Sequence, residues 1–386
     1  LMNELADLRA LILQQQSTLT QQQSALVQQQ STIAQLNATV AIQQSIIAAN
    51  NQGSGISSEL ATAFSNLRLN LGLLFNGTIR TIDSTGDVGL HTSLALTTAG
   101  FPVISYYDAP NGDLKLAVCA DATCSSGTTI RTIDSSPGFV GQYTSLALTT
   151  AGFPVISYYD TTNEDLKLAV CADATCSSTT TIRTIDSTGV VGQFTSLALT
   201  TAGFAVISYY DGTNGDLKLA VCADTTCSSG TTIRTIDSSP DVVGLYTSLA
   251  LTAAGFPVIS YYANSGGDLK LAVCADTTCS SGTTIRTIDS TARVGEFSSL
   301  ALTSAGFPVI SYYDGANFGL KLAVCADATC SSSTTIRTID STSNVGWFTS
   351  LALSTAGFPV IAYYDLTNQD LKLAVCADAT CSSGTT

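Results

Sequence analysis

Cysteine is the residue type of this sequence with the clearest chemical potential. All twelve cysteines lie in six C-x4-C pairs. Zinc sites combine such pairs with further cysteine or histidine ligands, and no histidine accompanies these. A cytosolic redox centre would not be copied six times, so the spacing favours a disulfide in each copy and an oxidising, extracellular setting. Free thiols and bridges between subunits are the alternatives. The pairs are Cys119/Cys124, Cys171/Cys176, Cys222/Cys227, Cys274/Cys279, Cys325/Cys330 and Cys376/Cys381.

A Tyr-Tyr-Asp sequence is the second group of residues that could do chemistry. It first occurs at Tyr106-Tyr107-Asp108 and recurs in each copy, although Ala263 replaces the aspartate in the fourth. A catalytic acid pair needs two distinct environments, whereas equivalent carboxylates favour loop capping or pairing with a repeated arginine. No calcium-loop pattern, nucleophile–base pair, phosphate loop or metal cluster is recognisable in the sequence. We therefore predict no enzyme, no catalytic residue, no cofactor and no metal.

Aromatic residues end a loop that differs from copy to copy, in the pattern V-G-x-aromatic. A ring of such residues beside a central mouth would stack on a sugar or a peptide; alternatively, it plugs the channel or supports the loop. The single tryptophan and the single histidine of the chain both occur here. The ligand-binding candidates, for a glycan or a cell-surface protein, are His91, Tyr143, Phe194, Tyr246, Phe297, Trp347 and Phe348.

A repeat that fills residues 78–386 must position these motifs. Its T-I-R arginine recurs alternately 51 and 52 residues apart, and a period near 50 is typical of propellers and solenoids. Each copy holds four short strand-like runs, which is one propeller blade. The sequence thus predicts a mainly β, six-bladed propeller of four-stranded blades. T-I-R-T-I-D also precedes the first copy, so we expect residues 78–83 to complete the last blade and close the ring.

The Tyr-Tyr-Asp motif carries a resemblance to known families. At Tyr106-Tyr107-Asp108 it follows an L-A-L-x-x-x-G strand, and this order resembles six-bladed propellers of the YWTD and NHL kind. The resemblance covers the repeat region alone, and the cysteine loop and the longer period depart from it. It implies the number of blades and says little about the ligand.

A seven-residue repeat precedes the propeller. One of its positions is apolar throughout and another holds either leucine or glutamine, which predicts a coiled coil with a half-polar seam. Such a stripe implies self-association, as a trimer or a filament. We divide the chain into a stalk helix at 1–49, a linker with a short second helix at 50–77, and the propeller at 78–386. The oligomerisation candidates are Leu5, Leu8, Ile12, Leu19, Leu26, Ile33, Leu36, Val40 and Ile47.

Composition limits the partners of this chain. A net charge of −14 makes nucleic acid and anionic membrane poor partners, because both need clustered lysine and arginine. No apolar run reaches the roughly 18–20 residues of a membrane span. Asn37 and Asn76 lie in N-glycosylation sequons. We also expect a leader or another upstream segment ahead of Leu1.

A helical stalk with a β-rich head is similar to phage receptor-binding fibres and bacterial adhesins. We therefore expect a self-assembling protein that is extracellular or lies on a cell or virion surface. Its head would bind a glycan or a surface protein through the varied loops. The alternative is a structural subunit of an extracellular filament or coat, with helices in the core and propellers outside.

Overall fold

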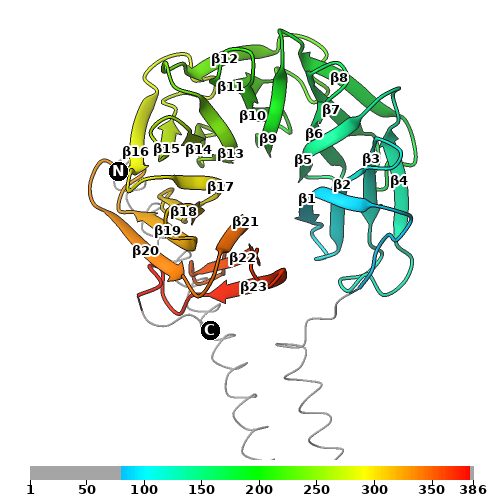
Figure 1. Cartoon of the computed structure of the whole chain (residues 1–386). Coiled ribbons are helices and arrows are strands. Elements are labelled where there is room, and N and C mark those ends of the chain that lie inside the picture. The colour runs from blue at the N-terminus through cyan, green and yellow to red at the C-terminus, as the bar shows by residue number, and fades with distance from the viewer. Residues whose placement is uncertain (1–79, 383–386) are drawn as a thin grey trace, which may run out of the picture. The chain divides into compact units, whose positions relative to one another are not determined.

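The structure, a computed structural model, describes residues 80–382. The regular elements of this part are all strands, which form six antiparallel sheets around a central channel (Figure 1). The prediction of a mainly β, six-bladed propeller is confirmed. The predicted stalk and linker lie outside the described residues, together with the nine heptad residues and both sequons.

Each blade repeats one order of strands from the channel outward (Figure 1). The innermost strands are β1 (Val88–Leu96), β5 (Val140–Leu148), β9 (Val191–Leu199), β13 (Val243–Leu251), β17 (Val294–Leu302) and β21 (Val345–Leu353). The second strands are β2 (Pro102–Asp108), β6 (Pro154–Asp160), β10 (Ala205–Asp211), β14 (Pro257–Ala263), β18 (Pro308–Asp314) and β22 (Pro359–Asp365). The third strands are β3 (Asp113–Val118), β7 (Asp165–Cys171), β11 (Asp216–Val221), β15 (Asp268–Val273), β19 (Gly319–Cys325) and β23 (Asp370–Val375). The outermost strands are β4 (Thr129–Asp134), β8 (Thr180–Asp186), β12 (Thr232–Asp237), β16 (Thr284–Asp289) and β20 (Thr334–Asp340).

The core lies between the blades, because each blade from the second to the fifth packs both of its faces against a neighbouring blade. Leu166 and Leu168 of the second blade, for example, are fully buried against Leu197 and Ile207 of the third. Burial on both faces explains why the strands lack a clear polar–apolar alternation. The approach is so close that a Cβ atom on Gly192 would lie 2.7 Å from the Leu166 Cα atom. The glycine of V-G-x-aromatic is therefore required by packing.

A polar network also joins neighbouring blades. In the third blade, the Lys218 Nζ atom lies 2.7 Å from Asp186 of the preceding blade and 3.6 Å from Asp211 of its own. The Tyr209 hydroxyl donates a 2.7 Å hydrogen bond to Asp186. Because these groups are buried together, each charge has its partner within the interface.

The aspartate of Tyr-Tyr-Asp has two roles. Asp211 accepts hydrogen bonds from the backbone N–H and the side-chain amide of Asn214, so the predicted loop capping is present. This aspartate does not make the predicted pairing between blades with the repeated arginine. Asp211 lies 3.6 Å from Lys218 of its own blade, and the carboxylate that Lys218 meets across the interface is Asp186. Arginines such as Arg183 and Arg234 lie exposed on the outermost strands β8 and β12.

All six predicted disulfides are formed, and the Cα atoms of each pair lie 4.9 or 5.0 Å apart. No cysteine within residues 80–382 is a free thiol, and every bridge lies within one chain, so both alternatives to this pairing were wrong. The disulfides are Cys119–Cys124, Cys171–Cys176, Cys222–Cys227, Cys274–Cys279, Cys325–Cys330 and Cys376–Cys381.

The second cysteine of each pair has a backbone conformation that the spacing did not predict. Its φ lies between 48° and 50°, in the left-handed region that residues other than glycine rarely adopt. Its N–H donates a hydrogen bond of 3.2 or 3.3 Å to the carbonyl of the aspartate three residues earlier, so a tight turn and the disulfide together hold this conformation. The residues concerned are Cys124, Cys176, Cys227, Cys279, Cys330 and Cys381. Each loop is therefore a defined turn as well as the predicted covalent link.

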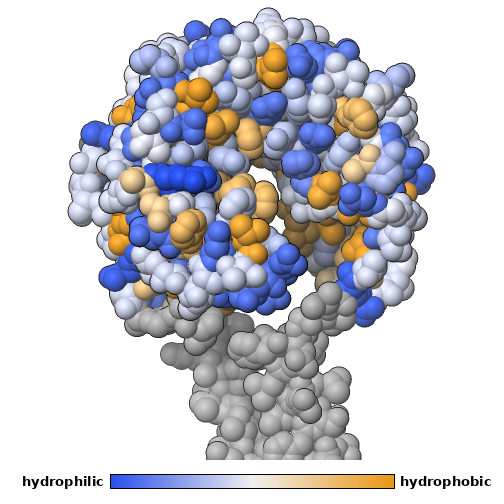
Figure 2. All heavy atoms as spheres, viewed as in Figure 1, coloured by the Kyte–Doolittle hydropathy of each residue, from blue (hydrophilic) through white to orange (hydrophobic). Residues whose placement is uncertain are grey.

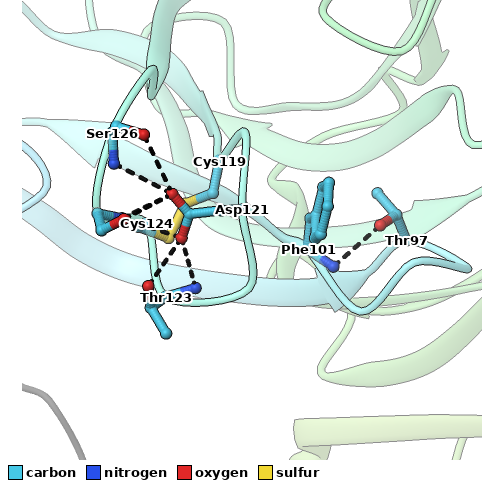
Figure 3. The surroundings of a disulfide bond; sticks show 8 residues. Thr97, Phe101, Cys119, Asp121, Thr123, Cys124 and Ser126 are labelled. Atoms are coloured by element: carbon cyan, nitrogen blue, oxygen red, sulfur yellow. Dashed lines mark hydrogen bonds between the residues drawn. A yellow bond between two sulfur atoms is a disulfide. The ribbon is translucent and has the colours of Figure 1, made fainter.

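Each disulfide loop follows the third strand of its blade. Figure 3 shows the first loop, in which the Asp121 carboxylate accepts hydrogen bonds from Thr123 and Ser126. Nearby, the Phe101 N–H donates to the Thr97 hydroxyl in the turn after β1. The uniform loops and turns therefore share one face of the propeller.

The ring has one open interface, between the sixth and the first blade (Figure 1). Among residues 80–382, no strand pairs with the outer edge of β23. As a result, Leu371 of β23 is 83% exposed and Leu94 of β1 is 60% exposed, whereas Leu320 and Leu300 at the matching positions are 0% and 8% exposed. The predicted four-stranded sixth blade has three strands in the described part of the chain.

Candidate functional site

The varied loops build one continuous rim on the face opposite the disulfides. The Val140 N–H of the second blade donates a 2.8 Å hydrogen bond to the Gly112 carbonyl in a varied loop of the first. The Thr161 N–H donates a 2.9 Å hydrogen bond to the Phe139 carbonyl of the preceding loop. The Phe139 N–H in turn donates to the Thr162 hydroxyl at 2.7 Å. Sequence differences between copies therefore accumulate around one mouth of the channel.

Six of the predicted ligand-binding residues form an aromatic collar around this mouth. Neighbouring rings lie 4.5 or 4.6 Å apart between centroids, with planes tilted by 50–57°. The order around the collar is His91, Tyr143, Phe194, Tyr246, Phe297 and Phe348. His91 and Phe348 are the two exposed ends, because they flank the open interface.

An irregularity in each innermost strand directs the collar residues into the channel. In the second blade the register shifts between Gln142 and Ser145, which brackets Tyr143. All six collar residues have a φ between 51° and 54°, a region that bulky side chains rarely adopt. A bulge of this kind re-aims a side chain, at a cost on the order of 1 kcal/mol per residue. The same unusual backbone in six copies indicates that the collar is a defined feature of this fold.

Hydroxyl groups line the channel beside the collar. The Thr144 and Ser105 hydroxyls, from neighbouring blades, lie 2.7 Å apart and are buried. The cavity at this mouth has a volume of about 900 Å³ and is lined by the collar, by the threonine or serine that follows each collar residue, such as Thr144, and by residues of β1 and β21 such as Leu94 and Leu351. Figure 2 shows the channel as an opening through the propeller with hydrophobic atoms on its wall. Its size falls in the range of small-molecule binding sites.

Trp347 does not belong to the collar. Its ring lies 5.1 Å from that of Phe297 and 5.3 Å from that of Tyr313 of the fifth blade. Its indole N–H donates a 3.0 Å hydrogen bond to the Asn344 side-chain oxygen, which also accepts a 2.8 Å bond from the Tyr313 hydroxyl. The tryptophan is thus fixed beside the collar, at the junction of the fifth and sixth blades.

A buried carboxylate lies on β17 of the fifth blade, directly opposite Tyr313 of β18. Glu296 is 8% exposed, and the Arg293 Nε atom donates a 3.1 Å hydrogen bond to it. Arg293 itself reaches solvent, with 62% of its side chain exposed. Burial, together with the charge of Glu296, raises the pKa of Tyr246 to about 12, so this hydroxyl remains a donor. We call Arg293, Glu296, Tyr313, Asn344 and Trp347 the Trp347 sector.

Sequence reasoning identified Trp347 and the collar but missed the rest of this sector. One signal was available, because Arg293 is the propeller's single basic residue outside the repeated arginines and lysines. Position 296 carried a second signal. The other blades have Leu90, Gln142, Gln193, Leu245 and Trp347 there, so Glu296 is its single charged residue.

The fold and the site define a six-bladed, disulfide-bonded β-propeller with an aromatic collar. No family model matches this chain, and no curated protein matches it in sequence. Solved structures share the fold. An α-L-arabinanase of Penicillium chrysogenum complexed with arabinobiose is 13% identical, with a TM-score of 0.54 over 74% of this chain and 92% of the arabinanase. An ulvan lyase is 11% identical, with a TM-score of 0.54 over 75% of this chain and 81% of its own. The SapL1 lectin in complex with α-methyl fucoside is 10% identical, with a TM-score of 0.51 over 78% of this chain and 95% of the lectin.

These comparisons correct the prediction that the protein is not an enzyme. An arabinanase and a lyase share the fold, so the prediction was wrong to set enzymes aside. The physical reason is that a fold positions a site without fixing its chemistry. The names of these three proteins describe two enzymes that act on glycans and one lectin that binds a sugar. None of the three is described as a propeller of the YWTD or NHL kind. At identities of 10–13%, these similarities show a shared fold and nothing about the function of this chain.

Two further observations bear on location. The six disulfides fit a secreted or extracellular protein. Within residues 80–382, no helix has the length and apolar character needed to span a membrane.

Proposed function

We propose that the propeller is a glycan-binding head and that the Trp347 sector, with the adjoining collar, holds the sugar. One observation carries this proposal. The repeat is nearly uniform, yet three residues that break its pattern lie close to Tyr313. The ring of the single tryptophan, Trp347, lies 5.3 Å from the Tyr313 ring. Glu296 is the cross-strand partner of Tyr313, and Arg293 donates a hydrogen bond to Glu296.

The chemistry of this sector suits a saccharide. A sugar presents an apolar C–H face that stacks on an aromatic ring, and Trp347 offers such a ring beside the collar. Its hydroxyls need acceptors and donors, which Glu296 and Arg293 supply. Hydrogen bonds to charged groups are roughly twice as strong as those between neutral groups. A few polar groups in a mainly aromatic setting are typical of a small-ligand site.

Assembly would strengthen such binding. The heptad residues, outside the described part of the chain, are proposed to bring several heads together on an extracellular or surface-bound particle. Linked heads that engage several sugars at once gain avidity without new contacts. The propeller fold of the lectin and the two glycan-acting enzymes is compatible with this proposal.

A glycan array probed with the labelled full-length chain tests the proposal. Trp347→Ala should weaken binding to the best ligand by about tenfold or more, as expected when a stacking anchor is lost. Gln142→Ala is the matched control, because Gln142 holds the same strand position in the second blade. Equal binding by the wild type and Trp347→Ala, or no binding to arrays and intact cells, would contradict the proposal.

The same experiment must separate binding from turnover. After incubation, the bound oligosaccharide should be analysed by mass spectrometry for shortened or unsaturated products. If products form, Glu296→Gln is the informative variant, because it keeps the size of the side chain and removes its charge. Intact ligand with retained binding supports a lectin-like head; product formation that Glu296→Gln abolishes would make the sector an active site.

A further inference from the structure

We propose that residues 80–83 of the same chain occupy the free edge of β23, complete the sixth blade and close the ring. This inference concerns the open interface between the sixth and first blades, which we call the seam. It does not depend on the proposed glycan binding.

Asp83 already occupies the position that closure requires. The Tyr106 hydroxyl donates a 2.7 Å hydrogen bond to Asp83, and the Lys115 Nζ atom lies 2.9 Å from the same carboxylate. At the other interfaces these contacts are made by the last residue of the preceding blade's outermost strand. Asp186 of β8 makes them with Tyr209 and Lys218, for example. Residue 83 therefore acts toward the first blade as the end of a preceding blade's outermost strand.

The repeat fixes the register of the missing strand. In the fifth blade, β19 pairs with β20 through Leu320–Asp340, Lys321–Thr338 and Leu322–Arg337. The corresponding pairs at the seam are Leu371–Asp83, Lys372–Thr81 and Leu373–Arg80. The residues preceding Asp83 thus carry the sequence and the length that the edge of β23 accepts.

The faces on both sides of the seam are apolar and exposed. Leu371 and Leu373 of the sixth blade are 83% and 59% exposed, whereas Leu320 and Leu322 are both 0% exposed. On the first blade, a cavity of about 280 Å³ is lined by residues 80–83 together with Ile104 and Tyr106. At the other interfaces the apolar face of the preceding blade fills this space, so the two exposed faces are matching halves of one interface.

Closure would also complete the mouth. His91 and Phe348 are the ends of the collar, and joining the first and sixth blades brings them together beside the Trp347 sector. The seam has one distinctive feature. Ala362 stands where the other blades have a serine that bonds to a channel hydroxyl, such as Ser311 with Thr349. Thr92 would therefore lack this partner at the seam.

Aspartate substitutions distinguish a closed ring from an open one. Leu371→Asp places a charge where the structure has an exposed side chain, so an open ring should tolerate it. In a closed ring, Leu371→Asp should lower the urea midpoint as much as Leu320→Asp does. Leu320 is the equivalent residue one blade earlier and is fully buried. An unchanged midpoint for Leu371→Asp would overturn the proposal. If Leu320→Asp does not fold, hydrogen exchange of the unmodified chain decides. Closure predicts that β23 amides exchange as slowly as those of β19, and faster exchange by about tenfold or more contradicts it.

A cysteine pair identifies the occupant. Arg80→Cys combined with Leu373→Cys places two thiols at directly opposed positions, within the Cα separation that a disulfide spans. A new disulfide within one chain supports the proposal. A disulfide between two chains would show that the strand comes from a second copy, and no disulfide would indicate another occupant; either result overturns the same-chain assignment. Glycan binding is not measured here, so failure of one proposal does not affect the other.

Discussion

The third and fourth blades differ at two residues of the interblade network, Asp211 against Ala263 and Thr188 against Ser239, and a buried lysine changes position between them. The serine does not account for the change, because the second blade has Ser136 at this position and its lysine lies 2.6 Å from Asp134. In the third blade, Asp211 lies beside Lys218, whose Nζ atom is 2.7 Å from Asp186. In the fourth, Ala263 replaces the aspartate and the equivalent lysine, Lys270, lies 3.5 Å from Asp237. The exposed fraction of this lysine rises from 10% to 16%. The second aspartate therefore holds the lysine against the neighbouring blade.

Acid should produce the largest effect, because it acts on every network at once. Burial raises the pKa of Asp186, but hydrogen bonds from Lys218, Thr188 and Tyr209 outweigh burial and leave the pKa below its ordinary value. A depressed pKa contributes stability above the unfolded-state value, about 3.9 for aspartate, and that stability is lost as the pH falls through the folded-state pKa. We expect the urea midpoint to be level from neutral pH to about pH 5 and to fall below about pH 4.

Two other carboxylates have a raised pKa and should act in the opposite direction at low pH. Burial and neighbouring carboxylates raise the pKa of Asp165 and Asp216, so protonation of these two residues relieves repulsion and offsets part of the loss. A urea midpoint that stays constant down to pH 2 would contradict a stabilising role for the networks. Asp186→Ala should flatten the acid limb, since it removes one depressed carboxylate.

Asp186→Ala should be the most damaging single substitution in this comparison. It leaves the Lys218 charge and the Tyr209 hydroxyl without their shared partner in a buried interface. Breaking one side of a buried pair costs about 3–5 kcal/mol. Asp237→Ala is the matched variant in the fourth blade, where the lysine lies farther away, and its loss should be smaller. Urea unfolding at pH 7 measures both; equal losses would show that the lysine distance carries no energetic weight.

Much of this architecture follows from repetition in the sequence, whereas the network does not. The number of strands and the disulfide pairing can each be predicted from a single copy of the repeat and the period from any two copies, and all six copies lead to the same prediction. The lysine–aspartate contact joins Asp186 to Lys218 of the next blade, which lies 32 residues further along the sequence. The residues around Asp186 in the sequence do not indicate whether its partner is the repeated lysine or the repeated arginine. The bulge that aims Tyr143 into the channel and the turn that ends at Cys124 were likewise hidden, since a φ above zero on such residues has no propensity signal.

The candidate site was only partly predictable for a related reason. Trp347 and His91 are conspicuous as single residues of their types, and the collar follows from its place in the repeat. The Trp347 sector depends on contacts across a blade junction. Glu296 and Trp347 are one period apart in sequence and meet around Tyr313 only after the blades have packed.

Disulfide removal tests whether the difference between the two blades is confined to the network. Cys222→Ser with Cys227→Ser should cost about 2 kcal/mol, from the entropy of a short closed loop. Cys274→Ser with Cys279→Ser should cost the same, because both loops are also held by an aspartate that bonds a following serine, Asp224 to Ser228 and Asp276 to Ser280. Paired urea titrations give the two values. A clear inequality would locate part of the difference outside the lysine contact.

Ala263→Asp should give the smallest effect and sharpens the comparison most directly, because it restores the third blade's arrangement in the fourth. The new carboxylate should draw Lys270 toward Asp237. Two features limit the gain. Gly266 stands where Asn214 supports the loop aspartate of the third blade, and Asp268 lies directly opposite position 263. We therefore expect stabilisation of about 1 kcal/mol or less, the net worth of one hydrogen bond. Adding Lys270→Met to both backgrounds isolates the contact. If the gain acts through the lysine, it should vanish in the double variant; a gain that persists would mean that loop capping alone explains the repeated aspartate.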